Sequence, residues 1–67
     1  MGRIDYEKLW TLMKDKGLST YRIQQENIIS QGTLQNIREG RNITTKSIAA
    51  LCKALDCQPG DILEYVD

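Results

Sequence analysis

The sequence lacks the residues on which most enzyme active sites depend. Its 67 residues include no histidine, and its serines, threonines and cysteines have no candidate base to activate them. It contains no glycine-rich phosphate loop and no cluster of carboxylates paired for acid–base chemistry. A chain this short buries only about 60% of its unfolded surface, which leaves little room for a pocket beside the core. We therefore expect no enzymatic activity.

Cysteine is scarce as well, with only Cys52 and Cys57 in the chain. Two cysteines without histidine make a poor metal site, because structural zinc needs a larger set of such ligands. Both stand beside apolar residues, so we expect two small buried hydrophobic side chains in a reducing environment. No apolar run approaches the roughly 18 residues that cross a bilayer, and no signal-peptide pattern opens the chain. The expected location is the cytoplasm, with no membrane contact, metal, cofactor or small-molecule ligand.

The chain also has no net charge, because nine basic residues balance nine acidic ones. These charges are unevenly distributed along the sequence. Residues 1–46 carry eight basic and five acidic residues, a net charge of +3, whereas residues 47–67 carry one basic and four acidic residues, a net charge of −3. Such an asymmetry can give the folded protein one cationic face, which contacts with phosphate groups require.

The spacing of apolar residues predicts an all-α fold and a single domain over residues 1–67. The expected helices are at about 5–16, 20–26, 30–40 and 44–55, followed by a short fifth helix that begins at 58–61. Asp5 is the expected N-cap of the first helix and Gly17 its end, while Thr44 or Thr45 caps the fourth. Pro59 suits the first position of the last helix, because its missing N–H costs no hydrogen bond there. Five short helices with brief loops predict a compact bundle.

The two middle helices fill residues 20–40, and a tight corner joins them. The residues expected to shape this pair are Ser19 or Thr20 as the first cap, Asn27 at the corner, Ser30 as the second cap, and Leu34 and Ile37 in the core. Asn27 is placed at the corner because asparagine tolerates a positive φ better than most residues do. Two short helices joined in this way have the layout of a helix-turn-helix.

Polar side chains cover the rest of the second helix of this pair. With Leu34 and Ile37 inside, the residues left mostly outside are Gln31, Gly32, Thr33, Gln35, Asn36 and Arg38. Glutamine and asparagine can bond N6 and N7 of adenine, and threonine can offer a hydroxyl or touch a thymine methyl. A solvated helix face needs no such purpose, but Gly32 weakens a first turn by up to about 1 kcal/mol and permits another surface to approach closely. The helix therefore favours contact with DNA bases.

The segment Thr20–Gly40, with apolar residues and glycine at these spacings, resembles the helix-turn-helix of phage-repressor-like (Cro/CI-type, XRE) regulators. The similarity extends to the opening helix and to the closing segment 56–63, which resemble small stand-alone members of that family. It implies a five-helix, lambda-repressor-like bundle that acts as a sequence-specific transcriptional regulator, with repression as the expected direction. The implied partners are double-stranded DNA and a second copy of the chain, with the helix from about Ser30 to Glu39 in the major groove.

The resemblance also implies roles for individual residues. Base contacts are expected from Gln31, Thr33, Gln35 and Asn36. Phosphate contacts are expected from Thr20, Tyr21, Arg22, Ser30, Arg38, Arg41, Asn42, Thr44 and Lys46. Two positions depart from the family pattern, because Gln24 stands where a small residue is common and Ile28 stands where glycine is favoured at the corner. The alternative is a protein-interaction module of the same fold, such as an antitoxin or adaptor, which the neutral total charge and the acidic final third favour.

Overall fold

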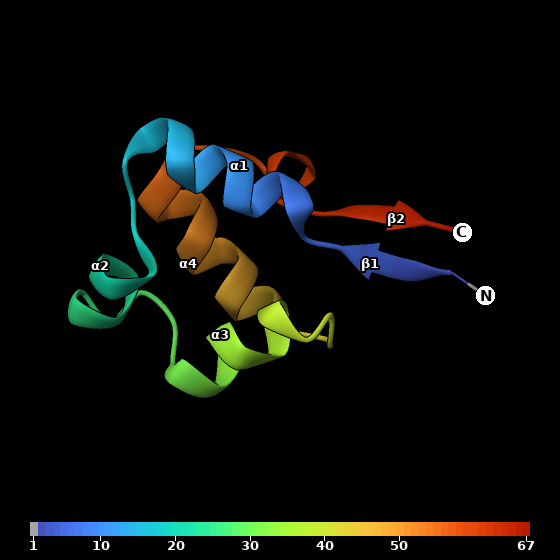
Figure 1. Ribbon diagram of the computed structural model, residues 1–67, viewed down its shortest axis with the longest axis horizontal. Helices are drawn as coiled ribbons and strands as arrows, with labels where there is room; N and C mark the ends of the chain where they lie inside the picture. The colour runs from blue at the N-terminus through green and yellow to red at the C-terminus, as the bar shows by residue number, and fades with distance from the viewer. Residues whose placement is uncertain (1) are drawn as a thin grey trace.

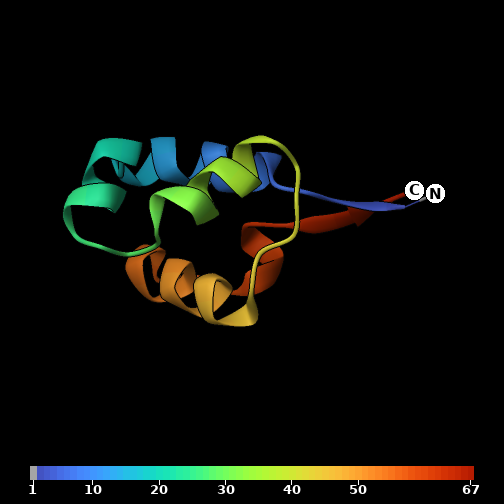
Figure 2. The ribbon, with the colours of Figure 1, turned by 90° about the horizontal axis from the view of Figure 1, so that it is seen from below.

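Four α-helices and a small two-stranded sheet make up the fold in the computed structural model, which describes residues 2–67 (Figure 1). The helices are α1 Glu7–Lys16, α2 Thr20–Gln25, α3 Gln31–Arg38 and α4 Thr45–Leu55. One 3-10 turn, η1, spans Pro59–Asp61, and the strands are β1 Arg3–Asp5 and β2 Glu64–Val66. Figure 2 shows α4 on one side of the molecule and α1, α2 and α3 on the other. The expected helical bundle is confirmed, although it has fewer helices than predicted.

The two ends of the chain differ from the prediction. Asp5 does not cap α1 but lies in β1, which pairs antiparallel with β2 and places Asp5 opposite Glu64. Tyr6 takes the N-cap position without a side-chain cap hydrogen bond. The expected fifth helix is a single 3-10 turn, after which the chain becomes extended and enters β2. The β1–β2 pair thus stands where the sequence predicted the Asp5 cap and the end of a fifth helix. The sequence did not indicate these strands, because three residues are too few to show an alternating pattern.

Hydroxyl side chains cap the other three helices, as their sequences predicted. In each cap a hydroxyl oxygen accepts a hydrogen bond from a backbone N–H three residues later. The distances are 3.2 Å from Arg22 N to Ser19 Oγ, 3.1 Å from Thr33 N to Ser30 Oγ, and 3.2 Å from Ser47 N to Thr44 Oγ1. Each bond satisfies a backbone donor that has no partner within its own helix. The caps are therefore Ser19 rather than Thr20, and Thr44 rather than Thr45.

All four α-helices end in the same way, with a residue in the left-handed conformation. These residues are Gly17 at φ 70°, Asn27 at φ 53°, Gly40 at φ 73° and Asp56 at φ 52°. In each case the next residue donates its N–H to a carbonyl five residues back, at 2.9 Å after α1, 3.1 Å after α2, 2.7 Å after α3 and 3.0 Å after α4. This is the Schellman arrangement, which satisfies helix carbonyls and turns the chain sharply. The prediction of a left-handed Asn27 at the corner is confirmed.

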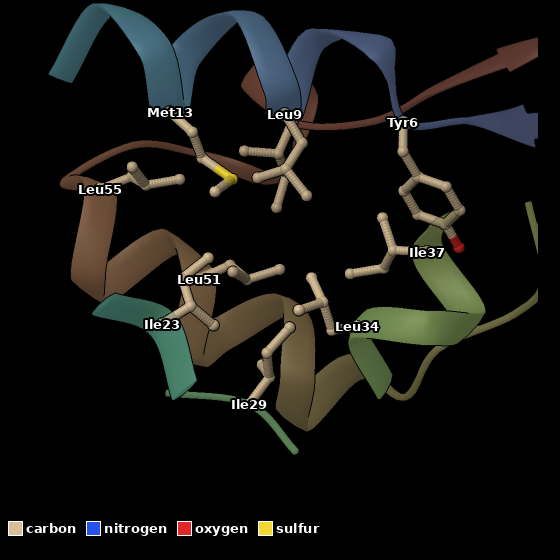
Figure 3. Close-up of a cluster of buried hydrophobic side chains, with 10 residues drawn as sticks. Tyr6, Leu9, Met13, Ile23, Ile29, Leu34, Ile37, Leu51 and Leu55 are labelled. Carbon is tan, nitrogen blue, oxygen red and sulfur yellow. The ribbon is translucent and has the colours of Figure 1, made fainter. Parts of the chain in front are cut away.

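Side chains from all four helices form one apolar core (Figure 3). Its buried members are Tyr6, Leu9, Met13, Ile23, Ile29, Leu34, Ile37, Leu51, Leu55 and Ile62. Leu34 and Ile37 are the buried residues of α3 and point inward as predicted. Trp10 is half-buried and packs against the edge of this cluster. The core thus holds α3 by one face and leaves its other face on the surface.

The two cysteines lie at the end of α4 and are less buried than expected. Cys52 and Cys57 are both free and half-buried, and both pack against the core. Burial raises the pKa of the Cys57 thiol, and the adjacent Cys52 raises it further. The thiol of Cys57 therefore stays protonated at neutral pH. Over residues 2–67, none of the helices is long and apolar enough to cross a membrane.

Replacing Asn27 with alanine tests the corner between α2 and α3. We expect Asn27→Ala to lower the free energy of unfolding by about 1 kcal/mol, because alanine lacks the short polar side chain that helps asparagine to adopt the left-handed conformation. Asn27→Gly is the matched control and should stay within about 0.5 kcal/mol of the parent, since glycine adopts this conformation without strain. Urea unfolding followed by circular dichroism measures both changes. Equal stability of the two variants contradicts a corner held by this backbone conformation.

Candidate nucleic-acid interface

The outer face of α3, together with its C-cap Glu39, carries a stripe of four residues without large apolar side chains. Gly32, Gln35, Asn36 and Glu39 follow one another at i, i+3, i+4 and i+7, which places them on one side of the helix. Gln35 and Glu39 are exposed and Asn36 is partly exposed. In Figure 1 this helix lies next to α2 and at the edge of the molecule away from α1, whereas Figure 2 shows α1 and α3 on the same side, opposite α4. We call these four residues the outer stripe of α3.

Several predicted contact residues come together at the start of α3. The Ser30 hydroxyl, besides capping the helix, lies 2.9 Å from the hydroxyl of Thr33, so the two side chains are joined. Lys46, from the first turn of α4, lines the same hollow as Ser30 and Thr33. Gln31 is exposed and lines a second hollow with Gln24, which follows Ile23 on α2. Residues of α2 and α4 thus lie beside the first turn of α3.

A network of hydrogen bonds orders the other end of α3. Gln35 donates from Nε2 to Oε2 of Glu39, while the other carboxylate oxygen of Glu39 lies 2.8 Å from Nη2 of Arg41. The N–H of Arg41 donates to the carbonyl of Asn36 at 2.7 Å. The carbonyl of Arg41 accepts a 2.7 Å hydrogen bond from the hydroxyl of Tyr6. Arg41 is therefore anchored through its backbone on both sides, and its exposed guanidinium sits beside the outer stripe.

The residues of α2 lie at different places around that helix. Thr20 is the first residue of α2 and is half-exposed. Tyr21 is 68% exposed, and its hydroxyl accepts a 2.9 Å hydrogen bond from Gln25 Nε2. Arg22 is paired with Glu26 at 3.0 Å and lines a hollow between α2 and α4. Arg22 is thus directed toward α4 rather than toward the outer stripe of α3.

The remaining predicted phosphate contacts are also unevenly placed. Arg38 lines a hollow with Arg3, Asp5 and Trp10, on the flank of α3 that faces β1 and α1. Asn42 and Thr44 lie in the exposed connection between α3 and α4, where Thr44 caps α4. The structure therefore brings Ser30, Gln31, Thr33 and Lys46 together at the start of α3 and Gln35, Asn36 and Arg41 at its end, and it places Arg22 and Arg38 on other flanks.

Two residues of this surface were not assigned a role from the sequence. Glu39 contacts both Gln35 and Arg41, and its spacing of four residues from Gln35 was a local signal that could have identified the first contact. Tyr6 is buried in the core, and its hydroxyl donates to the carbonyl of Arg41, which lies 35 positions away along the chain. No local pattern in the sequence indicates that second contact.

Comparisons with known proteins agree with this arrangement. Residues 8–67 match the model of the Cro/C1-type helix-turn-helix DNA-binding domain. The chain belongs to this family. It is 34% identical over 56 residues to the uncharacterized HTH-type transcriptional regulator YozG of Bacillus subtilis (strain 168), a match that covers 81% of this chain and 67% of that protein. It also matches the crystal structure of the transcriptional regulator VanUg, form II, with a TM-score of 0.88 and 28% identity, over 97% of this chain and 87% of that one.

In this Cro/C1-type domain, α2 and α3 are the two helices of the motif, and Asn27 forms the corner between them. The corner is one residue earlier than the glycine position of the family pattern, which Ile28 occupies here. Ile28 donates its N–H to the carbonyl of Ile23 at 3.1 Å, so the Schellman turn accommodates the departure. The resemblance found in the sequence is confirmed at the level of the family and the fold.

Substituting Tyr6 tests the anchor of the loop after α3. Tyr6→Phe removes only the hydroxyl, and we expect the free energy of unfolding to fall by about 1 kcal/mol, the usual net value of such a hydrogen bond. Burial raises the pKa of Tyr6 above its ordinary 10.0, so the folded state keeps its proton to higher pH than the unfolded state does. The parent should therefore lose stability as the pH rises above 10, and Tyr6→Phe should lack this part of the loss. Urea unfolding at pH 8 and at pH 10.5 measures both effects. Equal stability of the two proteins at pH 8 contradicts the anchor, and identical pH dependence contradicts burial of the hydroxyl.

Proposed function

We propose that this Cro/C1-type domain is a sequence-specific transcriptional regulator that places α3 in the major groove of DNA. The observation that supports this most directly is Gly32, at the start of the outer stripe in the first turn of α3. A Cβ added there meets only Ser30 Oγ, at 3.9 Å, and Gly32 does not have a positive φ. Neither packing nor backbone conformation within the domain requires glycine, which costs a helix about 1 kcal/mol relative to alanine. Close approach by an external surface such as a groove wall explains it.

Base contacts in this proposal come from the exposed side of α3. Gln31, Gln35 and Asn36 carry amides that can pair with adenine, and Thr33 can contact a thymine methyl while its hydroxyl stays on Ser30. Phosphate contacts come from residues around both ends of α3 and from the start of α2, namely Thr20, Tyr21, Ser30, Arg41, Asn42, Thr44 and Lys46. We also propose phosphate contacts from Arg22 and Arg38, which require these two side chains to move away from the positions that they have in the structure.

A single domain of this size makes few contacts with DNA, so we propose that two copies bind together. Half-sites for paired helix-turn-helix domains lie about 34 Å apart, one turn of the double helix. Two relatives are named transcriptional regulators, which supports a regulatory role, and repression by occupying the operator is the direction we propose. We further propose a cytoplasmic location, no catalytic activity and no small-molecule ligand.

Selection of binding sites from random duplex DNA tests this function. The enriched sequences show whether a preference exists and whether half-sites repeat with a helical turn between them. A titration of the selected duplex and a scrambled one at several salt concentrations then separates specific from general binding. We expect log K to fall steeply with log salt for both duplexes, because phosphate contacts release counterions. A gap in affinity between the two duplexes reports the base contacts.

Substitutions should separate the two kinds of contact. Gln31→Ala or Asn36→Ala is expected to reduce base preference at one position by roughly 5-fold or more, since each bidentate contact discriminates by about 1–3 kcal/mol. Arg41→Ala should weaken binding to all duplexes and lower the salt slope by about 1. Thermal midpoints check that each variant is folded. Unfolding of the domain by Gln31→Ala shows that this residue is structural instead.

Gly32 offers a substitution in which stability and binding move in opposite directions. Gly32→Ala should raise the free energy of unfolding by up to about 1 kcal/mol, because alanine has the higher helix propensity and no side chain lies in its way. The same methyl group should weaken binding to the selected duplex by keeping the groove wall away from α3. Urea unfolding and a binding titration on one preparation measure both effects. Unchanged affinity shows that Gly32 does not face DNA.

A protein-interaction module of the same fold is the second candidate. It is favoured by an open hollow of about 680 Å³ along α1 and η1, whose acidic residues outnumber its basic ones. The acidic residues are Asp5, Glu7, Asp15, Asp56, Asp61 and Glu64, and the basic ones are Lys8 and Lys16. Absence of DNA affinity at about 50 mM salt, where phosphate contacts are strong, favours this second function over the first.

A further inference from the structure

Glu39 lies on the outer stripe of α3, and its carboxylate has two partners. One oxygen accepts from Nε2 of Gln35, and the other pairs with Nη2 of Arg41 at 2.8 Å. Gln35 is proposed above as a base contact and Arg41 as a phosphate contact. A single acidic side chain therefore joins two residues of the proposed DNA surface.

Neither folding nor affinity for DNA explains a carboxylate at this position. Glu39 directly follows the last residue of α3, where the partial negative charge of the helix end disfavours an acidic side chain. Its ion pair with Arg41 is exposed, and exposed pairs add little to stability. A negative charge on a surface that approaches phosphates also weakens binding. The position of Glu39 is therefore unfavourable in two respects, which suggests a role in ordering its neighbours.

That role follows from the chemistry of the Gln35 amide. An ionised carboxylate only accepts hydrogen bonds, so the NH2 group of Gln35 must face Glu39 and the amide oxygen must face away. One N–H of Gln35 is then used by Glu39, and the edge left free carries the oxygen and the other N–H. This edge presents an acceptor beside a donor, which matches N6–H and N7 of adenine. It does not match guanine, whose N7 and O6 are both acceptors.

We propose that Glu39 is a positioning residue that fixes the amide orientation of Gln35 and thereby makes Gln35 select adenine. The inference rests on the proposed function, because it concerns the DNA contacts of α3. Arg41 contributes to this arrangement by pairing with the second carboxylate oxygen of Glu39. The Arg41 backbone is itself fixed by Asn36 and by the buried Tyr6, so the orientation of Gln35 is linked to the core through a chain of hydrogen bonds.

Glu39→Gln is the test, with Glu26→Gln as its matched control. Glu26 pairs with Arg22 in α2 much as Glu39 pairs with Arg41, and it has no bond to a proposed base contact. Both substitutions remove one negative charge and release one arginine. The glutamine placed at 39 can both donate and accept, so it tolerates either orientation of the Gln35 amide. The probes are the duplex that the parent protein selects from random DNA and its single-base variants.

We expect both variants to bind all duplexes more tightly than the parent does. In Glu39→Gln alone, the preference for adenine over guanine at one position should fall at least about 5-fold, while Glu26→Gln keeps the parental preference. This loss should vanish in a Gln35→Ala background, because the two residues act through one contact. Thermal midpoints should remain close to the parental value, since the side chains of Glu39 and Glu26 are partly exposed.

Equal base preferences of Glu39→Gln and Glu26→Gln overturn the proposal, because Glu39 then acts only as a charge. A loss of preference that persists in the Gln35→Ala background overturns it as well. A parent protein that shows no base preference refutes the proposed function itself, and the inference with it. A parent preference that neither substitution alters leaves the proposed function standing and rejects the role of Glu39.

Discussion

Burial of Leu34 and Ile37 is the interaction on which the candidate interface depends. An isolated helix as short as α3, with eight residues, is not stable in water, so α3 exists because these two side chains enter the core. They are 1% and 2% exposed, whereas the rest of the helix lies at or near the surface. The core therefore specifies the position of α3 through one narrow face. The opposite face is left free for residues chosen for contact with another molecule.

The ends of the helices determine how that face is presented. Left-handed residues close all four α-helices, and two of them, Asn27 and Gly40, stand on either side of α3. Asn27 turns the chain from α2 into the short link through Ile28 and Ile29 to Ser30, whose hydroxyl caps the start of α3. Gly40 turns the chain out of α3 so that Arg41 can bond back to Asn36. Local backbone geometry thus sets both boundaries of the helix, and the same geometry brings Arg41 beside the outer stripe.

Much of this arrangement could be predicted because it depends on near neighbours in the sequence. The caps at Ser30 and Thr44, the corner at Asn27 and the inward side chains of α3 all follow from spacings of a few residues. The β1–β2 pair could not be predicted in this way, because it joins the first and last few residues of the chain. The bond from Tyr6 to Arg41 has the same origin, since only the fold brings these residues together.

The candidate site shows the same division between local and distant information. The amides of α3 could be assigned to its outer side from the positions of Leu34 and Ile37 alone. The directions of the Arg22 and Arg38 side chains could not be predicted from the sequence, because they depend on how α4, β1 and α1 pack against the motif. Charge at a position predicts that a phosphate contact is possible, but its direction is set by the tertiary structure.

The zero net charge of the chain hides an uneven distribution of charge over the surface of the folded molecule. Ions screen exposed charges beyond about 8 Å at physiological salt, so a nearby phosphate responds to the closest residues rather than to the total. Lys46 and Arg41 lie near the two ends of α3, whereas six carboxylates line the hollow along α1 and η1. In Figure 1, η1 and the C-terminal half of α1 lie away from the start of α3. Zero net charge therefore does not exclude local attraction of DNA phosphates to Lys46 and Arg41, because most of the carboxylates lie in another part of the surface.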